Sequence, residues 1–519
     1  MKILSVAQMQ MVEKTADAGG LSYNQMMKNA GRGIALWMLE HLSFQNGVIG
    51  LIGSGNNGGD TLIALDTLAQ KGIRTIGFII RDRGEDQLIA DYLDHGGSVI
   101  DLSQNQNLSY FKASLSPGAI ILDGVLGTGL RLPLRGLLCD VMATLHHMVK
   151  NSPGALVIAV DCPSGMDCDS GEVSEEILHA QHTLCIAAIK QGLLKPPGCT
   201  FVGNLHRIDI GIENLNRKLE QGIPILIDQA YVADHLPLRP PTGHKGTFGT
   251  CLIVAGTQPF TGAAYLSGKA AYRSGCGLVN IATLDKVQSA LSGQLVETVW
   301  TVLPEVAGTY GIDGIELLNA KFSSADADSL IIGPGWGMMK KNIEFLDQLL
   351  DILPIGLSLL VDADGLKLLT HLDSWWERLP AHTVLTPHPG EMSILTGLDI
   401  PEIQSNRWQV AREFARQWDV VLVLKGAVTV IAAPSGDLLI NPVCDPALAT
   451  AGSGDVLAGV IGGLMAQGSP VLNASAIGTW IHGQAGLFAK QRLGSDAAVT
   501  AMDILDSLPN TIRITRKDI

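Results

Sequence analysis

Two glycine-rich loops carry residues that could bind a phosphate group and move a proton. The first spans residues 53–60 and reads G-S-G-N-N-G-G-D, and the second spans residues 449–455 and reads A-T-A-G-S-G-D. Small residues at the start of a helix let backbone N–H groups approach an anion, and the helix dipole favours negative charge there. We therefore expect a phosphate-binding loop in each half of the chain.

The second loop ends at Asp455 and leads into an apolar helix predicted over residues 456–466. The amides of Gly452, Ser453 and Gly454 would form an anion hole, while Asp455 would accept a proton from a substrate hydroxyl. Aspartate in the first turn of a helix is also a frequent stabilising charge. The combination of amides with a carboxylate favours the catalytic interpretation, in which Asp455 is the base of a phosphoryl transfer.

The first loop satisfies G-x-G-x-x-G between a predicted strand at 48–52 and a predicted helix at 61–71. This pattern is typical of a dinucleotide-binding turn, and Asp82 follows the next strand, where such folds bind ribose. The glycines alone would also suit an ordinary tight turn. Against a conventional oxidoreductase, N-N-G-G-D is more polar than a pyrophosphate turn requires, and a helical segment at 6–41 precedes the strand.

Two more aspartates follow predicted strands in the first half. Asp123 comes at the end of the strand at 119–122 and precedes a second glycine loop, and Asp161 follows the strand at 155–160 and precedes P-S-G. In an open α/β sheet, ligands bind outside the carboxyl ends of the strands. Polar groups at three strand ends therefore indicate one binding site.

Short apolar runs that alternate with helical patterns predict parallel sheets covered on both faces. In the first half the predicted strands are residues 48–52, 76–80, 119–122 and 155–160. In the second half they are residues 251–256, 330–333, 359–362, 384–386 and 420–425, with a hairpin of 429–433 and 438–441 expected at the sheet edge. The polar stretch at 213–221 separates the halves, so we expect two α/β domains, at 1–215 and 222–515.

A P-loop-like segment at 262–269 is a weaker candidate for phosphate binding. Its spacing differs from a Walker motif, and Ala270 replaces the Ser or Thr that would bind magnesium. We expect a tightly packed helix there instead.

The composition restricts the class of protein. The chain has 519 residues, 46% hydrophobic and 17% charged, and a net charge of −14. An acidic chain lacks the basic surface that nucleic acids and anionic membranes require, and no apolar run is long enough to span a bilayer. The eight cysteines include no C-x-x-C pair, which is typical of reduced thiols. We expect a cytoplasmic enzyme with small-molecule ligands.

Over residues 1–215 the motifs N-N-G-G-D, D-x-x-x-G-T-G and V-D-x-P-S-G-M-D, with the segment around Lys190, resemble the NAD(P)H-hydrate epimerase family. The resemblance implies a Rossmann-like three-layer domain that epimerises the hydrated nicotinamide at C6, and Asp161 is our candidate for its acid–base group. It implies potassium ligands at Asn57, Asp123 and Ser164, whose oxygen atoms suit a hard cation. The implied cofactor-binding residues are Asn56, Asn57, Gly58, Gly59, Asp60, Gly127, Thr128, Gly129, Leu130, Arg131, Leu132, Pro133 and Asp161.

Over residues 222–515 the chain resembles the ribokinase-like fold and, within it, the ADP-dependent NAD(P)H-hydrate dehydratase family. The matching segments, in order, read G-H-K-G-T-F-G, I-G-P-G, V-D-A-D-G, L-T-P-H-P-G-E, L-K-G-A-V-T and A-T-A-G-S-G-D. The resemblance implies that Ala263, Gly335, His388 and Asp455 contact the hydrated cofactor. It implies nucleotide contacts from Lys425, Gly426, Ala427, Val428, Thr429 and Gly454.

The implied chemistry explains the need for a nucleotide. Hydroxide is a poor leaving group, whereas phosphate leaves readily, so phosphorylation of the C6 hydroxyl would allow the ring nitrogen to expel it. We expect ADP, or ATP, as phosphoryl donor, Mg²⁺ with the nucleotide, and K⁺ in the first half. The other expected ligands are NADHX and NADPHX, and we expect a homo-oligomer.

Two positions depart from the family patterns, Gly124 in place of alanine and Ala447 in place of the glycine of N-P-G. Loss of that glycine would alter the loop if it needed a left-handed backbone. Two other functions stay open at this point. One is an NAD-dependent oxidoreductase fused to a ribokinase-like small-molecule kinase, and the other is a non-catalytic cofactor-binding protein.

Overall fold

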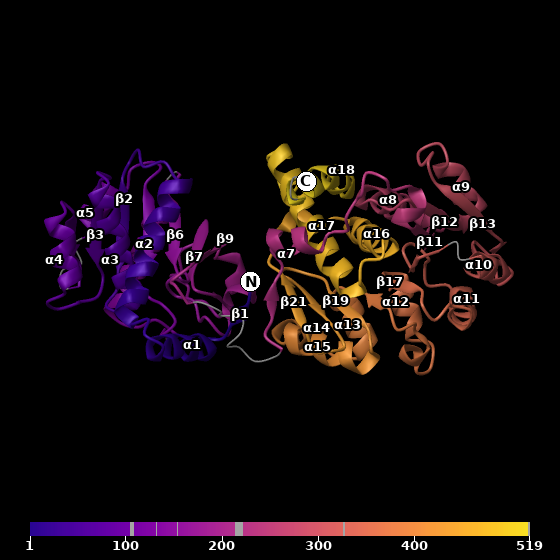
Figure 1. Ribbon diagram of the computed structural model, residues 1–519, viewed down its shortest axis with the longest axis horizontal. Coiled ribbons are helices and arrows are strands. Elements are labelled where there is room, and N and C mark those ends of the chain that lie inside the picture. The colour runs from indigo at the N-terminus through magenta and orange to yellow at the C-terminus, as the bar shows by residue number, and fades with distance from the viewer. Residues whose placement is uncertain (104–107, 131, 153, 213–221, 325–326, 517–519) are drawn as a thin grey trace. The chain divides into compact units, whose positions relative to one another are not determined.

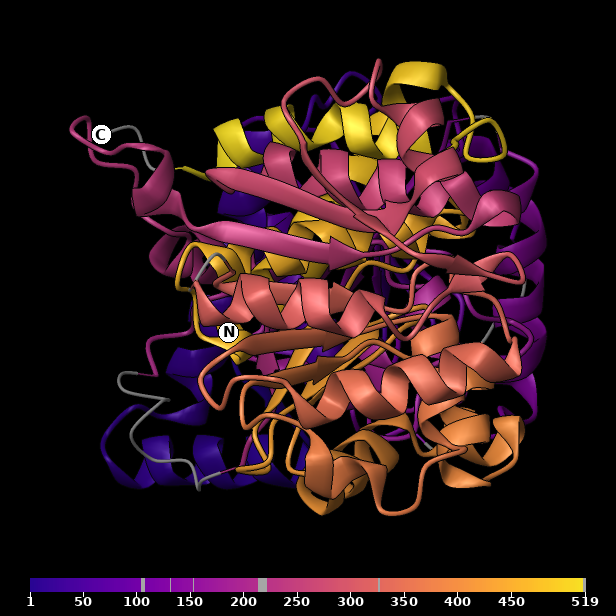
Figure 2. The same cartoon turned by 90° about the vertical axis from the view of Figure 1, so that its right-hand side faces the viewer.

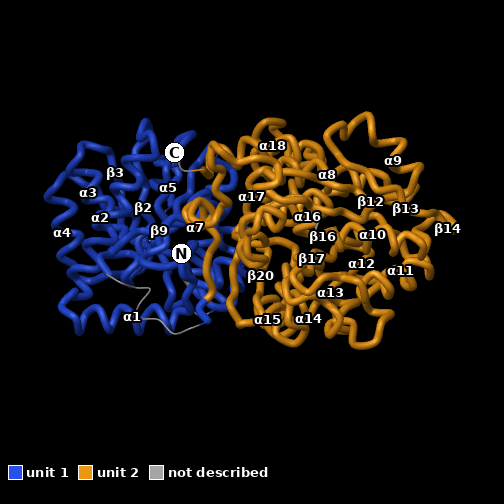
Figure 3. The backbone as a smooth tube through the Cα atoms, turned by 45° about the vertical axis from the view of Figure 1, so that its right-hand side comes forward, with its two compact units in different colours: residues 1–223 blue, residues 224–519 orange. Residues whose placement is uncertain are grey.

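The computed structural model describes residues 1–103, 108–130, 132–152, 154–212, 222–324 and 327–516. The chain divides into two compact units, residues 1–223 and 224–519, shown in separate colours in Figure 3. The polar stretch at 213–221, where we predicted the boundary, lies outside the described residues. Each unit is described by itself below.

The first unit is built on a parallel sheet. Its strands are β1 (Ile3–Leu4), β2 (Val48–Ile52), β3 (Thr75–Ile79), β4 (Ser98–Asp101), β5 (Ile120–Gly124), β6 (Leu156–Val160), β7 (His182–Ile186), β8 (Ile189–Lys190) and β9 (Asn204–Ile208). Its helices are α1 (Val6–Ala18), α2 (Tyr23–His41), α3 (Asn56–Gln70), α4 (Gln87–Asp94), α5 (Ser109–Ser114) and α6 (Leu137–Lys150).

Seven of these strands form one sheet in the order β4-β3-β2-β5-β6-β7-β9, and every neighbouring pair is parallel. The chain runs outward from β2 through β3 to β4 and then returns to the other side of β2 as β5. This reversal is a topological switch point, where open α/β sheets bind ligands outside the strand ends. The loops after β2 and β5 border that point.

Apolar side chains cover both faces of this sheet. In β2, Val48 and Ile52 join the core beneath α2 and α3, whereas Ile49 and Leu51 join the core beneath α5 and α6. Successive residues of a strand point to opposite faces, so a continuous apolar run is what a doubly covered strand requires. The predicted three-layer α/β architecture is confirmed.

The second unit repeats this architecture at larger size. Its strands are β10 (Ile225–Leu226), β11 (Thr250–Val254), β12 (Leu278–Leu284), β13 (Val299–Leu303), β14 (Glu305–Val306), β15 (Thr309–Tyr310), β16 (Ser329–Ile332), β17 (Ser358–Val361), β18 (Thr383–Leu385), β19 (Val421–Leu424), β20 (Thr429–Ala432) and β21 (Leu438–Asn441). Its helices are α7 (Gln229–His235), α8 (Thr261–Ser274), α9 (Asp285–Leu291), α10 (Gly314–Ser323), α11 (Lys340–Asp351), α12 (Asp364–Leu369), α13 (Pro389–Thr396), α14 (Ile400–Ser405), α15 (Arg407–Trp418), α16 (Ser453–Ala466), α17 (Val471–Leu493) and α18 (Ala501–Thr515).

The main sheet of this unit has the order β10-β21-β20-β19-β18-β17-β16-β11-β12-β13. Helices α8, α16, α17 and α18 lie on one side of the strands and α11 to α15 on the other (Figures 1 and 2). The predicted hairpin exists as the antiparallel pair β20 and β21. Its predicted place at the sheet edge is wrong, because β10 pairs in parallel with β21 and forms the edge itself.

Several helix limits also differ from the predictions. The expected helix at 6–41 is two helices, which are separated at Gly19 and Gly20. Helix α3 begins at Asn56 rather than at residue 61, and α16 begins at Ser453 rather than at residue 456. The last residues of each glycine-rich segment therefore form the first turn of its helix.

The P-loop-like segment at 262–269 lies inside α8, which confirms the prediction of a packed helix. A Cβ atom on Gly459 of α16 would lie 2.2 Å from the carbonyl oxygen of Ser267, so the two helices are in close contact.

All eight cysteines are free thiols, as predicted. Among the described residues, no helix combines the length and apolar character needed to cross a membrane.

Candidate functional sites

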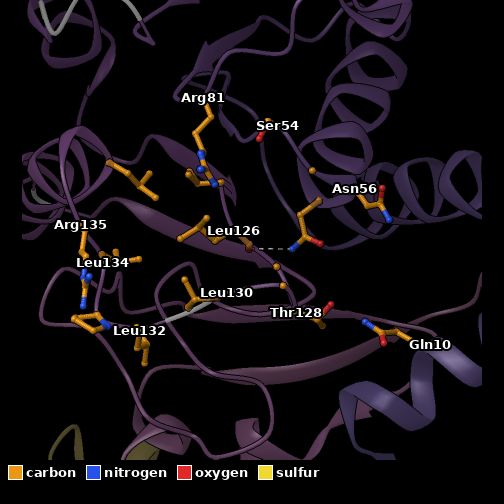
Figure 4. A pocket seen from close by; sticks show the side chains of 17 residues that line it. Gln10, Ser54, Asn56, Arg81, Leu126, Thr128, Leu130, Leu132, Leu134 and Arg135 are labelled. Carbon is orange, nitrogen blue, oxygen red and sulfur yellow. Dashed lines mark hydrogen bonds between the residues drawn. The ribbon is translucent and has the colours of Figure 1, made fainter.

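A cavity of about 890 Å³ opens at the switch point of the first unit (Figure 4). One wall comes from the β2–α3 turn, with Ser54, Gly55, Asn56 and Asn57. The opposite wall is the loop after β5, with residues 125–130 and 132–135, and Arg81 after β3 adds a cation. Backbone amides at the start of α3 and an apolar loop thus share one cavity, a combination that suits a nucleotide ligand.

Eight of the residues predicted to bind the hydrated cofactor line this cavity. They are Asn56, Asn57, Gly127, Thr128, Gly129, Leu130, Leu132 and Pro133. Gly58, Gly59, Asp60 and Asp161 are not part of its lining, and Arg131 lies outside the described residues. Sequence reasoning did not single out Arg81, although its charge and its place after a strand could have indicated it.

Of the three predicted potassium ligands, Asp123 and Ser164 are hydrogen-bonded to each other, and Asn57 is linked to them through Leu126, whose amide donates to Ser164 Oγ at 2.9 Å. The Ser164 hydroxyl donates to Asp123 Oδ1 at 2.6 Å, and the Ser164 amide donates to Asp123 Oδ2 at 2.9 Å. The side-chain amide of Asn57 donates to the carbonyl oxygens of Leu126, at 3.1 Å, and Val160, at 2.7 Å. The side chains from α3, β5 and the loop after β6 therefore meet at the strand ends.

The Asp123 carboxylate is fully buried and, among the described residues, contacts only neutral donors. Burial raises its pKa, and the hydrogen bonds from Ser164 and Val125 lower it. A buried carboxylate without a cation is costly. A bound monovalent cation among these oxygen atoms would supply the missing charge, so the residues present fit the potassium site.

Asp161 has a different environment. Its backbone is in the left-handed region, with φ of 67°, and its carboxylate accepts hydrogen bonds from the buried Lys190 ammonium and from the Ile186 amide. Burial raises the pKa of the nearby Asp60 well above its usual range, and the negative charges of Asp161 and Glu13 raise it further. The cluster thus pairs a carboxylate held by a lysine with a carboxyl group whose pKa is raised.

In the second unit, charged side chains from the ends of β17 and β19 and from the first turn of α13 meet at the first turn of α16. Lys425 Nζ lies 2.7 Å from Asp362 Oδ1 and 3.6 Å from Glu391 Oε2. A Cβ atom on Gly454 would lie 3.6 Å from Lys425 Nζ and 3.7 Å from Asp362 Oδ2. Neither Asp362 nor Glu391 was predicted as a site residue, although both belong to motifs that carried the resemblance.

This arrangement sets the acidity of Asp455, the third residue of α16. Burial and the neighbouring negative charge of Asp362 raise the pKa of Asp455 from 3.8 to about 7, although the Lys425 ammonium lowers it. A general base works best when its pKa is near the working pH. Asp455 therefore has the acidity that a proton acceptor needs near neutral pH.

The backbone at the start of α16 differs in one detail from the expected anion hole. Gly452 is the N-cap, with φ of 83° that favours glycine, but the Ser453 amide donates to the carbonyl oxygen of Thr450 at 3.2 Å. Of the predicted anion hole, only the Ser453 amide is engaged, whereas the amides of Gly452 and Gly454, like that of Asp455, have no acceptor within the described residues.

A buried histidine supports the same turn. His482 of α17 lies with Nε2 3.0 Å from the Ser453 hydroxyl oxygen, and burial lowers the pKa of His482 to about 4. The neutral ring therefore holds the Ser453 side chain in place. Nothing in the sequence indicated this contact, because the two residues are 29 positions apart.

The predicted nucleotide-binding loop joins β19 to β20. Gly426 and Ala427 are exposed, whereas Val428 is buried with φ of 61°, an unfavourable conformation for a β-branched residue. The buried Arg407 donates to the carbonyl oxygens of Leu424, at 2.9 Å, and Lys425, at 3.1 Å. This arginine, which was not predicted, fixes the loop beside the charged cluster.

Of the remaining predicted cofactor contacts, Ala263 and Gly335 lie by the switch point of the second sheet, between β11 and β16, and His388 follows β18. Gly335 follows β16, and a Cβ atom there would lie 2.9 Å from Ala263 of α8. His388 caps α13, since its Nδ1 accepts from the amides of Gly390 and Glu391, and its half-exposed ring contacts Glu391. Both ring nitrogens of His388 therefore have partners within α13, although the side chain stays half-exposed.

The two departures from the family patterns have local explanations. Ala447 lies in a short 3₁₀ helix over Pro446–Leu448 and does not have a positive φ, so glycine is not required there. A Cβ atom on Gly124 would lie 1.9 Å from Thr61 Oγ1 and 2.8 Å from the carbonyl oxygen of Asn57. The smaller residue therefore makes room for Thr61.

No group of three or more His, Cys, Asp or Glu side chains suited to a metal occurs in the part of the chain that the structure describes.

Comparison with known proteins identifies both units. A family model described as NAD(P)H-hydrate dehydratase matches residues 251–510, and one described as YjeF-related protein N-terminus matches residues 23–192. A solved ribokinase-like superfamily protein from Enterococcus faecalis matches with a TM-score of 0.50 at 24% identity, covering 59% of this chain and all of that one. This likeness confirms the ribokinase-like fold of the second unit.

Relatives also match along nearly the whole chain. The bifunctional NAD(P)H-hydrate repair enzyme Nnr of Moorella thermoacetica is 34% identical over 95% of this chain and 93% of its own length. The enzyme of the same name from Salinibacter ruber is 33% identical over 98% of this chain and 95% of its own length. The chain therefore belongs to the family of bifunctional NAD(P)H-hydrate repair enzymes.

Proposed function

We propose that the second unit dehydrates the S epimer of NADHX and NADPHX in a reaction that consumes ADP or ATP. The observation that carries this proposal is the meeting of Asp455, Lys425 and free backbone amides at the start of α16. A base with a pKa of about 7, a cation and an anion hole are the groups that a phosphoryl transfer to a hydroxyl requires.

In the proposed reaction, Asp455 accepts the proton of the C6 hydroxyl while the oxygen of that hydroxyl attacks the terminal phosphorus of the nucleotide. The bond from that phosphorus to the bridging oxygen breaks, which leaves AMP from ADP or ADP from ATP. The lone pair of the ring nitrogen then expels phosphate from C6, and loss of a proton from C5 restores the dihydropyridine ring. The sum is the removal of water and the hydrolysis of one phosphoanhydride.

Residues around Asp455 would divide the other tasks. Gly454 and the exposed backbone of Gly426 and Ala427 would contact the nucleotide phosphates, and Lys425 would balance their charge. Ala263, Gly335 and His388 would contact the hydrated cofactor. Magnesium is usually held by one or two carboxylates and the substrate phosphates, and it would lower the negative charge on the transferred group.

For the first unit, we propose epimerisation of the hydrated cofactor at C6 in the cavity at its switch point. Asp161, held by Lys190, would act as the base, and Asp60, whose pKa is raised by burial, would act as the nearby acid. Potassium would be held by Asn57, Asp123 and Ser164. Two observations support this assignment: the cavity has the size of a nucleotide, and the buried cluster of Asp161, Lys190 and Asp60 adjoins its lining, since Asn57 of the lining donates to Val160, the residue before Asp161.

The two activities are separable in one experiment. Mixed R and S epimers of NADHX are incubated with ADP or ATP, and NADH is followed by absorbance while chromatography resolves the epimers. The full chain should convert both epimers, whereas a fragment of residues 222–519 should convert S and leave R, apart from spontaneous epimerisation. Rapid loss of both epimers with the fragment would contradict the division of labour, and no NADH with either nucleotide would contradict the dehydration. The cytoplasmic location and the homo-oligomeric state stay predictions.

A further inference from the structure

Arg81 is a cation of the first-unit cavity that the proposed mechanism does not use. It follows β3, lines the cavity, and extends from the upper edge of Figure 4 toward Leu126. Within the described residues, no hydrogen bond or ion pair holds its guanidinium group. An arginine that lines a ligand cavity without a protein partner is available to an anionic ligand.

The neighbouring charged residues are already engaged. Asp82 is exposed, lies outside the cavity lining, and accepts from the amide of Gly84 at 2.9 Å. Arg83 donates to the carbonyl oxygens of Gly53, at 2.6 Å, and Gly55, at 3.1 Å, and pairs with Asp86. Arg83 therefore supports the glycine loop, and of these three residues only Arg81 is directed to a ligand.

The position of Arg81 indicates which phosphate it would meet. The carboxyl end of β3, next to the glycine loop, is where dinucleotide folds distinguish cofactors: an acidic residue binds the free ribose 2′-hydroxyl, and an arginine accommodates a 2′-phosphate. Here the acidic residue, Asp82, is turned to its own loop. The pyrophosphate has separate donors, because Gly55 leaves the N-terminus of α3 without a side-chain cap.

We propose that Arg81 binds the 2′-phosphate of the hydrated cofactor, so that the first unit prefers NADPHX to NADHX. This inference rests on the proposed epimerase function and specifies its substrate. Loss of one charge-assisted contact to a phosphate typically lowers affinity by about 10-fold or more.

The test uses the full chain without added nucleotide, so that dehydration does not consume the S epimer. Separated R epimers of NADPHX and NADHX are supplied, and formation of S is followed by chromatography for the wild type and Arg81→Gln. Arg74→Gln is the matched control, because Arg74 is exposed, precedes the same strand and does not line the cavity. Equilibrium binding of NADP⁺ and NAD⁺ is measured on the same variants. Binding to sites elsewhere in the chain contributes equally to each variant and to the wild type, so it cancels when the two are compared.

The expected result is a rise of about 10-fold or more in KM for NADPHX with Arg81→Gln, little change for NADHX, and little change of either with Arg74→Gln. An equal rise for both substrates would assign Arg81 to the shared pyrophosphate and overturn the proposal, as would no rise for either. If neither R epimer is converted, the epimerase proposal fails by itself. In that case, selective loss of NADP⁺ binding still supports the phosphate site, and unchanged or equal binding overturns it.

Discussion

The ammonium group of Lys425 lies 2.7 Å from the carboxylate of Asp362, and both groups adjoin the first turn of α16. Burial alone would lower the pKa of Lys425, but the negative charges of Asp362 and Glu391 raise it, so the lysine stays protonated. This fixed cation limits the rise in the pKa of Asp455 and would attract the phosphates of a nucleotide. The pair thus brings the ends of β17 and β19 together at the site of the proposed chemistry.

Asp455→Asn should abolish dehydration with little effect on nucleotide binding. Asparagine keeps the shape of the side chain and can still interact with the free amides of the helix start. It cannot accept the proton of the C6 hydroxyl, and loss of a positioned base typically lowers the rate by about 100- to 10,000-fold. Turnover with S-NADHX and nucleotide binding by calorimetry measure the two effects.

Asp503→Asn is the matched control for this variant. Asp503 holds the same position in α18 that Asp455 holds in α16, but it is capped by Thr500 and lies near the surface. Turnover should be unchanged by Asp503→Asn. Near-normal turnover with Asp455→Asn would make Asp455 a helix charge and would leave the proposed reaction without its base.

The raised pKa of Asp455 also predicts how stability depends on pH. Between pH 3.8 and about 7 the folded chain keeps a proton that the unfolded chain has released, so this group makes the wild type less stable as the pH rises. Asparagine does not titrate. The melting temperature of Asp455→Asn minus that of the wild type should therefore increase from about pH 4 to about pH 7 and then level off. A difference independent of pH would contradict the raised pKa.

The sequence predicted the central strands well because a strand covered on both faces must be apolar throughout. It missed β12, where Asn280 and Thr283 interrupt the apolar run. Both polar groups have partners in the folded chain, since Asn280 accepts from Thr301 at 3.0 Å and Thr283 donates to the carbonyl oxygen of Gly256 at 3.1 Å. Pairing between distant segments therefore made a polar strand interior possible, and periodicity cannot reveal such pairing.

The site was predicted in part for a similar reason. Asp455 could be found because one short segment contains both the small residues and the carboxylate. Asp362 and Glu391 are 93 and 64 residues away from Asp455 in the sequence. Only the order of β17, β18 and β19 in the sheet brings their side chains to Lys425. The early starts of α3 and α16 were missed because glycine has low helix propensity, which tertiary packing overrides here.

Lys425→Met should destabilise the second unit and shift the pH dependence of dehydration upward. Removing the ammonium leaves the buried carboxylates of Asp362 and Glu391 without their cation, and breaking such a pair typically costs about 3 to 5 kcal/mol. Because the ammonium lowers the pKa of Asp455, its loss should raise that pKa. Denaturant unfolding and the rate of dehydration against pH measure the two effects.

Lys341→Met is the control for Lys425→Met, since Lys341 forms an exposed pair with Glu344 at 2.8 Å. Exposed pairs are typically worth about 1 kcal/mol or less. Equal destabilisation by both variants, or an unchanged pH profile with Lys425→Met, would show that Lys425 does not control the charge of the site.

Asp123→Asn should remove the response of the first unit to potassium. In the wild type the buried carboxylate lacks a charged partner among the described residues, so a bound cation should stabilise the fold. A ligand that binds only the folded state at about 100 times its Kd contributes about 2.7 kcal/mol. The melting temperature of the first unit should therefore rise when potassium replaces tetramethylammonium, a cation too large to enter, and this rise should be absent in Asp123→Asn.

Asp82→Asn is the control, because Asp82 is an exposed carboxylate of the same unit outside the cluster, and its potassium response should match the wild type. Dehydration by the second unit should persist in both variants. Loss of dehydration with Asp123→Asn would mean that Asp123 supports the folding of the whole chain, and an undiminished potassium response would place the cation elsewhere.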